Sequence, residues 1–103
     1  MIDQLIMDEL VKANREHGLF HSLHEGYAIL KEEIEEANDE ITLLTGDIGL
    51  IWSACKSDNA KWANQLSKDA YTDAVHLIKE AVQVAAMTRK LMLYAEAVSE
   101  DGR

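Results

Sequence analysis

The chain has 103 residues, which is the size of one domain, and we treat residues 1–103 as a single domain. Its 48% apolar content is typical of a globular protein and not of a disordered one. Nineteen acidic against ten basic residues give a net charge of −9, which argues against nucleic acids and anionic membrane surfaces as partners.

The N-terminus and the cysteine content favour a cytoplasmic protein. The first residues, MIDQLIMDELVK, carry acids where a signal peptide needs bases, and no apolar run reaches the ~18 residues of a membrane span. The single cysteine, Cys55, excludes an internal disulfide framework and is expected to be a small packing residue. An acidic chain of this kind can still bind a nucleotide if a divalent cation neutralises the site.

The first predicted element is a helix over residues 2–17. Apolar side chains recur there at three- and four-residue spacing, and Gly18 is a natural stop. The chain contains no proline, no alternating β-branched run and no Asn-Gly or Asp-Gly hairpin turn. These features together predict an all-α fold.

A second helix is predicted over residues 23–44. Ser22, with Glu25 three residues later, has the pattern of a capping box at its start, and Gly46 is expected to end it. The apolar stripe of this helix consists of Leu23, Tyr27, Leu30, Ile34, Ala37, Ile41 and Leu44.

Residues 46–68 are predicted to form two short helical pieces separated by a turn at residues 57–59. The last helix is predicted over residues 69–98, and it is apolar on several sides, which is typical of a helix buried nearly all round. Because so small a domain can hardly cover such a helix, we expect a compact bundle of about four helices completed by association into a homodimer or homotetramer.

An acidic run, EEIEE at residues 32–36, lies in the second helix. Helical residues advance by about 100°, which divides the acids into Glu33, Glu36 and Glu40 on one flank of the apolar stripe and Glu32, Glu35 and Asp39 towards solvent. Carboxylates three and four residues apart repel one another, and a hard cation such as Mg²⁺ relieves that repulsion. The alternative interpretation is a solvated charge run on a surface helix.

A second polar stripe lies on one face of the last helix, where the spacing is three, four and three residues: Asp73, His76, Glu80 and Gln83. A glutamate in the apolar context of Glu80 needs a partner or a metal, so the two stripes are candidates for one shared cation site. Alternatively, Glu80 pairs with a lysine or arginine and only fixes packing, and His76 is a structural histidine.

Two sequence blocks, HEGYAILKEEIEEANDEI at residues 24–41 and KEAVQVAAMTRKLM at residues 79–92, resemble the MazG-like all-α nucleoside triphosphate pyrophosphohydrolases. They look most like the small phage-type members and cover about a third of the chain. The family's metal pattern is ExxE on one helix and ExxD on a later one. It falls on Glu33 with Glu36, and on Glu80 with Gln83, where an amide replaces the aspartate.

The resemblance implies a hydrolase that cleaves a nucleoside triphosphate between the α- and β-phosphates, giving the monophosphate and pyrophosphate. Mg²⁺, or Mn²⁺ in its place, would bridge the phosphates. The implied catalytic metal ligands are Glu33, Glu36 and Glu80 with Gln83, and the additional candidates are Glu40, Asp73 and His76. Phosphate contacts are expected from Lys79 and Arg89, with Lys90 as a further candidate, although each is alternatively an ordinary surface side chain.

Two other functions stay open. Because Gln83 brings no charge, the chain is alternatively a weakened or inactive nucleotide- and metal-binding bundle with a structural or regulatory role. The least favoured hypothesis is a carboxylate-bridged di-metal bundle, whose usual sign is Glu-x-x-His on two helices. Its ligands here would be Glu33, Glu36, Asp73, His76 and Glu80.

Overall fold

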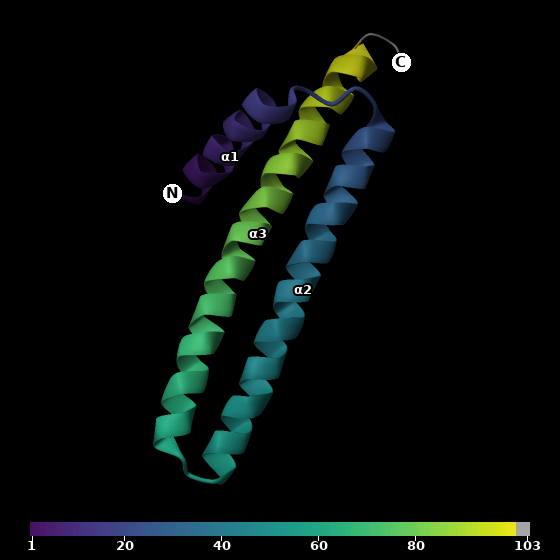
Figure 1. Cartoon of the computed structure of the whole chain (residues 1–103). Coiled ribbons are helices and arrows are strands. Elements are labelled where there is room, and N and C mark those ends of the chain that lie inside the picture. The colour runs from purple at the N-terminus through teal and green to yellow at the C-terminus, as the bar shows by residue number, and fades with distance from the viewer. Residues whose placement is uncertain (101–103) are drawn as a thin grey trace.

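The computed structural model describes residues 1–100, and within that range the chain forms three helices and no strand. α1 spans Ile2–His17, α2 spans Leu23–Lys56 and α3 spans Ala60–Glu100. The predicted all-α class is confirmed, although the described helices number three and not about four. α2 and α3 form a long antiparallel hairpin, and α1 lies against the C-terminal half of α3 (Figure 1). The molecule is elongated, measuring 63 × 24 × 19 Å.

The ends of α1 and α2 follow the predicted signals. Gly18 has a φ of 72°, a left-handed conformation that glycine adopts without steric cost, and it stops α1 as predicted. Ser22 caps α2, because its Oγ accepts a hydrogen bond from the backbone N–H of Glu25 at 3.0 Å. The Glu25 carboxylate lies instead beside His21, with 3.2 Å between Oε2 and Nδ1.

The predicted end of the second helix at Gly46 is wrong. α2 continues through Gly46 and Gly49 to Lys56, and neither glycine has a positive φ. A glycine inside a helix costs roughly 1 kcal/mol relative to alanine. This penalty is outweighed because Leu44 and Ile51, on either side of the glycines, both pack partly buried in the hairpin.

The short helices predicted within residues 46–68 are therefore the distal ends of two long helices. The predicted turn at residues 57–59 is confirmed, and Asp58 adopts a φ of 50° within it. Asn59 Oδ1 accepts a hydrogen bond from the backbone N–H of Trp62 at 3.0 Å, so it caps the next helix. The last helix consequently begins at Ala60 and not near residue 69.

Apolar and acidic layers alternate along the α2–α3 interface in a heptad pattern, which keeps one seam of each helix facing its partner. On α2, at alternating spacings of three and four, the sequence reads Leu30, Glu33, Ala37, Glu40, Leu44, Asp47 and Ile51. On α3, at the same spacings, it reads Ala70, Asp73, Leu77, Glu80, Val84, Met87 and Leu91. Carboxylates thus occupy layers that normally hold apolar side chains.

The hydrophobic core lies where α1 and the connector after it meet α3. Its buried members are Leu10, Ala13, Phe20, Ala86 and Met87. Gly26 allows a close approach here, since a Cβ at that position would lie 2.6 Å from Leu91 Cδ1. The connector is also tied to α3 by the Tyr94 hydroxyl, which donates to the backbone oxygen of His21 at 3.2 Å.

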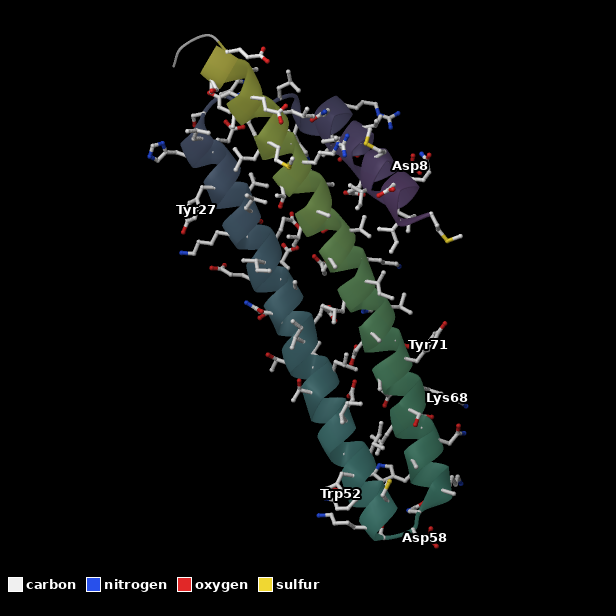
Figure 2. All side chains as sticks on the ribbon, turned by 180° about the vertical axis from the view of Figure 1, so that it is seen from behind. Asp8, Tyr27, Trp52, Asp58, Lys68 and Tyr71 are labelled. Atoms are coloured by element: carbon white, nitrogen blue, oxygen red, sulfur yellow. The ribbon has the colours of Figure 1, made fainter. Side chains whose placement is uncertain are left out.

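Much of the hairpin's apolar surface is uncovered. Ile34, Ile41 and Ile48 follow one another at seven-residue intervals on α2 and are 46%, 46% and 55% exposed. Tyr27 and Tyr71 point away from the α2–α3 interface (Figure 2). Tyr27, Ile34 and Ile41 belong to the apolar stripe that was predicted to pack, and the prediction is wrong for them, because they are exposed in the single chain. None of the three helices in residues 1–100 is long and apolar enough to span a membrane.

Cys55, near the tip of the hairpin, is exposed as a free thiol. The expectation that it is a packing residue is therefore wrong. Its neighbour Ala54 takes the buried position in the seam instead.

Candidate metal centre

Carboxylates from α2 and α3 meet in the middle of the hairpin. Glu33 and Glu36 on α2 and Glu80 on α3 each offer one oxygen, and these oxygens all lie within 4.8 Å of one another. Helical spacing places Glu33 and Glu36 one turn apart, and the antiparallel pairing brings Glu80 opposite them. Within residues 1–100, no lysine or arginine forms an ion pair with any of the three. The negative charge of the cluster is therefore not neutralised by a side-chain cation.

The protonation of the cluster reflects this crowding. Burial raises the pKa of Glu33, and the charges of Glu36 and Glu80 raise it further. The pKa of Glu80 is raised by burial, by a hydrogen bond with Glu36 and by the charge of Glu36. Ionisation of all three carboxyl groups is thus unfavourable, and a bound divalent cation would stabilise the ionised forms.

Gln83 completes the cluster as a hydrogen-bond donor. With its amide nitrogen turned towards the carboxylates, Gln83 donates to Glu33 Oε2 at 2.9 Å and to Glu80 Oε2 at 3.1 Å. In the opposite orientation of the amide, its oxygen faces the same two carboxylates. The side chain therefore bridges the two acids in the absence of a cation, and it presents an oxygen ligand after a half-turn of the amide.

A second acidic group lies one heptad further along the hairpin. Glu40 on α2 and Asp73 and His76 on α3 offer ligand atoms that lie within 4.8 Å of one another. His76 Nδ1 is 4.0 Å from Glu40 Oε2, and this oxygen is buried without a hydrogen-bond partner. The five residues of the di-metal hypothesis are thus distributed over two neighbouring groups.

Asp47 extends the acidic layers by one more heptad, and the sequence reasoning missed it. A hydrogen bond with Asp73 raises the pKa of Asp47 to about 6, and its partial burial and the charges of Asp73 and Asp69 act in the same direction. The seven-residue spacing from Glu40 was the signal that could have found it. The predicted helix end at Gly46 hid that signal, because residue 47 then lay outside the helix.

A pocket of about 580 Å³ lies beside the first acidic group, between all three helices. Glu33 and Gln83 line one part of it, and Phe20, Met87 and Lys90 line another. Its size is in the range of small-molecule sites.

The predicted phosphate contacts Lys79 and Arg89 are exposed and do not line this pocket. Lys90, the further candidate, is buried in its wall. Lys90 follows Gln83 by seven residues and so shares its face, whereas Arg89 does not. Lys79, four residues before Gln83, is near that face but lies outside the pocket.

Comparison of the chain with protein families, with curated proteins and with solved structures gives no match. The resemblance to MazG-like enzymes consequently stands on the two sequence blocks alone.

Proposed function

We propose that this chain is a cytoplasmic, Mg²⁺-dependent nucleoside triphosphate pyrophosphohydrolase, with Mn²⁺ as the alternative cation. The observation that carries the proposal is the meeting of Glu33, Glu36 and Glu80 from two helices without a side-chain cation between them. Mg²⁺ prefers oxygen ligands and is usually held by a few carboxylates together with substrate phosphates. The motif order shared with MazG-like enzymes supports the same chemistry.

The donor set fits a hard divalent cation. Glu33, Glu36 and Glu80 would hold it, and Gln83 would add its amide oxygen. When bound, the cation supplies charge neutralisation to the phosphates and acidity to a coordinated water.

The chain's own carboxylates orient the attacking water and take up its proton. The water oxygen bonds to the α-phosphorus, and the bond from that phosphorus to the bridging oxygen of the β-phosphate breaks. The products are the nucleoside monophosphate and pyrophosphate.

The second candidate function is a binding bundle of the same fold that does not turn over its nucleotide. It is favoured by one observation, the two hydrogen bonds that Gln83 donates to Glu33 and Glu80. In this orientation of the amide, one oxygen of Glu33 and one of Glu80 have a donor without a metal, and the amide contributes no charge to hold one.

The deciding experiment incubates the full chain with each ribo- and deoxyribonucleoside triphosphate and Mg²⁺ and measures pyrophosphate release. We expect release from at least one nucleotide, and we expect Glu33→Gln to lower its rate at least about 100-fold. Glu35→Gln is the matched control, because this exposed glutamate lies two residues away on α2 and outside the cluster. No release by protein with a native helical spectrum would reject hydrolysis. Calorimetric nucleotide binding without release would establish the second candidate.

We also propose that the chain acts as a homodimer or homotetramer. The support is the exposed apolar row of Ile34, Ile41 and Ile48, which a second copy would cover. Two paired helices that project beyond α1 have few apolar neighbours of their own, so a partner would supply the missing layer (Figure 1).

A further inference from the structure

Lys90 is a charged side chain in the interior of this small protein. It is only 6% exposed, in a chain where the other buried side chains are apolar or small. Buried lysines are rare unless they are paired, because removing an ammonium group from water is costly. The desolvation of Lys90 lowers its pKa, and the charge of Glu25 opposes that shift. The cost of burying this ammonium group indicates that Lys90 has a role other than packing.

No residue within positions 1–100 forms an ion pair with Lys90. Glu25 is the acid whose charge acts on it, but the Glu25 carboxylate is engaged by His21 at 3.2 Å. The ammonium instead lies over the ring of Phe20, with 4.5 Å between Nζ and the ring centroid. A cation–π contact of this kind offsets only part of the lost hydration.

Lys90 also faces a space that a ligand can enter. Lys90 and Phe20 both line the pocket of about 580 Å³, and Glu33 and Gln83 of the acidic cluster line it as well. One cavity thus borders both a buried ammonium that forms no ion pair within residues 1–100 and, through Glu33 and Gln83, the edge of the carboxylate cluster. A ligand that fits both must carry negative charge towards Lys90 and must reach the carboxylates through a divalent cation.

We propose that Lys90 binds the polyphosphate chain of the substrate, as an anion-binding residue of the pocket that Glu33 and Gln83 line where it borders the acidic cluster. The identification of the anion as a polyphosphate rests on the proposed function. Of the three phosphate contacts considered from the sequence, Lys79 and Arg89 lie outside the pocket and only Lys90 lines it.

The test measures binding of inorganic tripolyphosphate to the full chain by calorimetry in the presence of Mg²⁺. Lys90→Met removes the charge and keeps a long apolar stem, and we expect at least a tenfold loss of affinity. Lys79→Met makes the same charge change at an exposed site on the same helix and is expected to stay within twofold of wild type. Without ligand, Lys90→Met is expected to melt several degrees higher, because the buried charge is gone.

A second measurement uses the wild-type protein, so that it does not depend on the folding of a variant. Acetylation of lysines is followed by mass spectrometry with and without tripolyphosphate and Mg²⁺. We expect the ligand to slow acetylation at Lys90 and to leave Lys79 unchanged.

The results separate this inference from the proposed function. Lys90-dependent tripolyphosphate binding without hydrolysis of any nucleotide would keep the anion site and reject the enzyme. Nucleotide hydrolysis in which Lys90→Met keeps the wild-type KM and tripolyphosphate affinity would keep the enzyme and overturn the role of Lys90. Failure of the wild type to bind tripolyphosphate, or a lower melting temperature of Lys90→Met with unchanged affinity, would also overturn it.

Discussion

Asp47 on α2 and Asp73 on α3 face each other across the hairpin, where their carboxyl groups are placed to share a hydrogen bond. Such a bond requires a proton on one of the two, and it raises the pKa of Asp47 to about 6. Asp47 Oδ2 is buried and has no other hydrogen-bond partner. The stability of the hairpin is therefore linked to pH.

The sign of this linkage follows from the direction of the shift. Because the folded state holds the proton more tightly than the unfolded chain, the stabilisation is full below about pH 4 and is lost as the pH rises through about 6. Glu33 and Glu80, whose pKa values are also raised, act in the same direction.

We predict that the melting temperature falls between pH 5 and pH 7.5. Asp47→Asn, which keeps a donor to Asp73, should flatten this dependence and melt higher at pH 7.5. Asp39→Asn is the control, since Asp39 is an exposed acid on the same helix. Circular dichroism melts across the range check both. A wild-type melting temperature that rises towards pH 7.5 would contradict the prediction.

Replacing Gln83 with aspartate should make the fold depend on a divalent cation. The substitution removes the donors to Glu33 and Glu80 and adds a fourth carboxylate, so we expect a loss of roughly 1–3 kcal/mol without metal. With millimolar Mg²⁺, the same variant should recover more of its melting temperature than wild type gains, because binding stabilises the folded state. Melts with Mg²⁺ and with a chelator give the comparison. An equal response of the two proteins to Mg²⁺ would show that the cluster does not hold the cation.

The glycines inside α2 offer a test of its continuity. No side chain lies within 4 Å of a Cβ placed at Gly46 or Gly49, and both have helical backbone. Alanine at either position should therefore stabilise the protein by about 0.5–1 kcal/mol. Gly18→Ala should instead destabilise it, because φ is 72° there. Denaturant unfolding measures all three, and destabilisation by both α2 substitutions would indicate that the helix breaks near residue 46.

Self-association is expected to depend on the isoleucine row of α2. Sedimentation velocity at micromolar concentration should show a dimer or tetramer for the wild type. Ile41→Gln should shift the chain towards monomer, because it places an amide in the centre of the row. Thr42→Gln changes the adjacent exposed residue and should leave the assembly intact. A wild-type protein that sediments as a clean monomer would remove the case for association.

Local signals predicted the start of the fold well. The stop at Gly18, the cap at Ser22 and the turn at residues 57–59 each involve residues only a few positions apart, so short stretches of sequence carry them. The end of α2 was predicted wrongly because glycine propensity is a local property. The force that carries the helix past Gly46 is packing against α3, which is distant in sequence.

In the candidate site, too, some features follow from local sequence and others depend on contacts between distant segments. Helical spacing alone placed Glu33 and Glu36 on one flank, and the structure brings Glu80 to them. The pocket could not be predicted, because it requires α1 to lie across α3, and no spacing within one helix specifies that contact. The sequence named Lys90 together with Lys79 and Arg89, and only the docking of α1 shows that Lys90 is the one that lines the pocket.

The placement of α1 has a consequence for the order of folding. α2 and α3 meet through a three-residue turn and can zip locally, whereas the Tyr94–His21 bond joins residues 73 positions apart. We therefore expect α1 to dock last and to undock first in local opening. Since α1 supplies a wall of the pocket, a ligand bound there would slow hydrogen exchange in α1 more than at the hairpin tip. Hydrogen exchange of the α1 amides would thereby report whether the pocket is occupied.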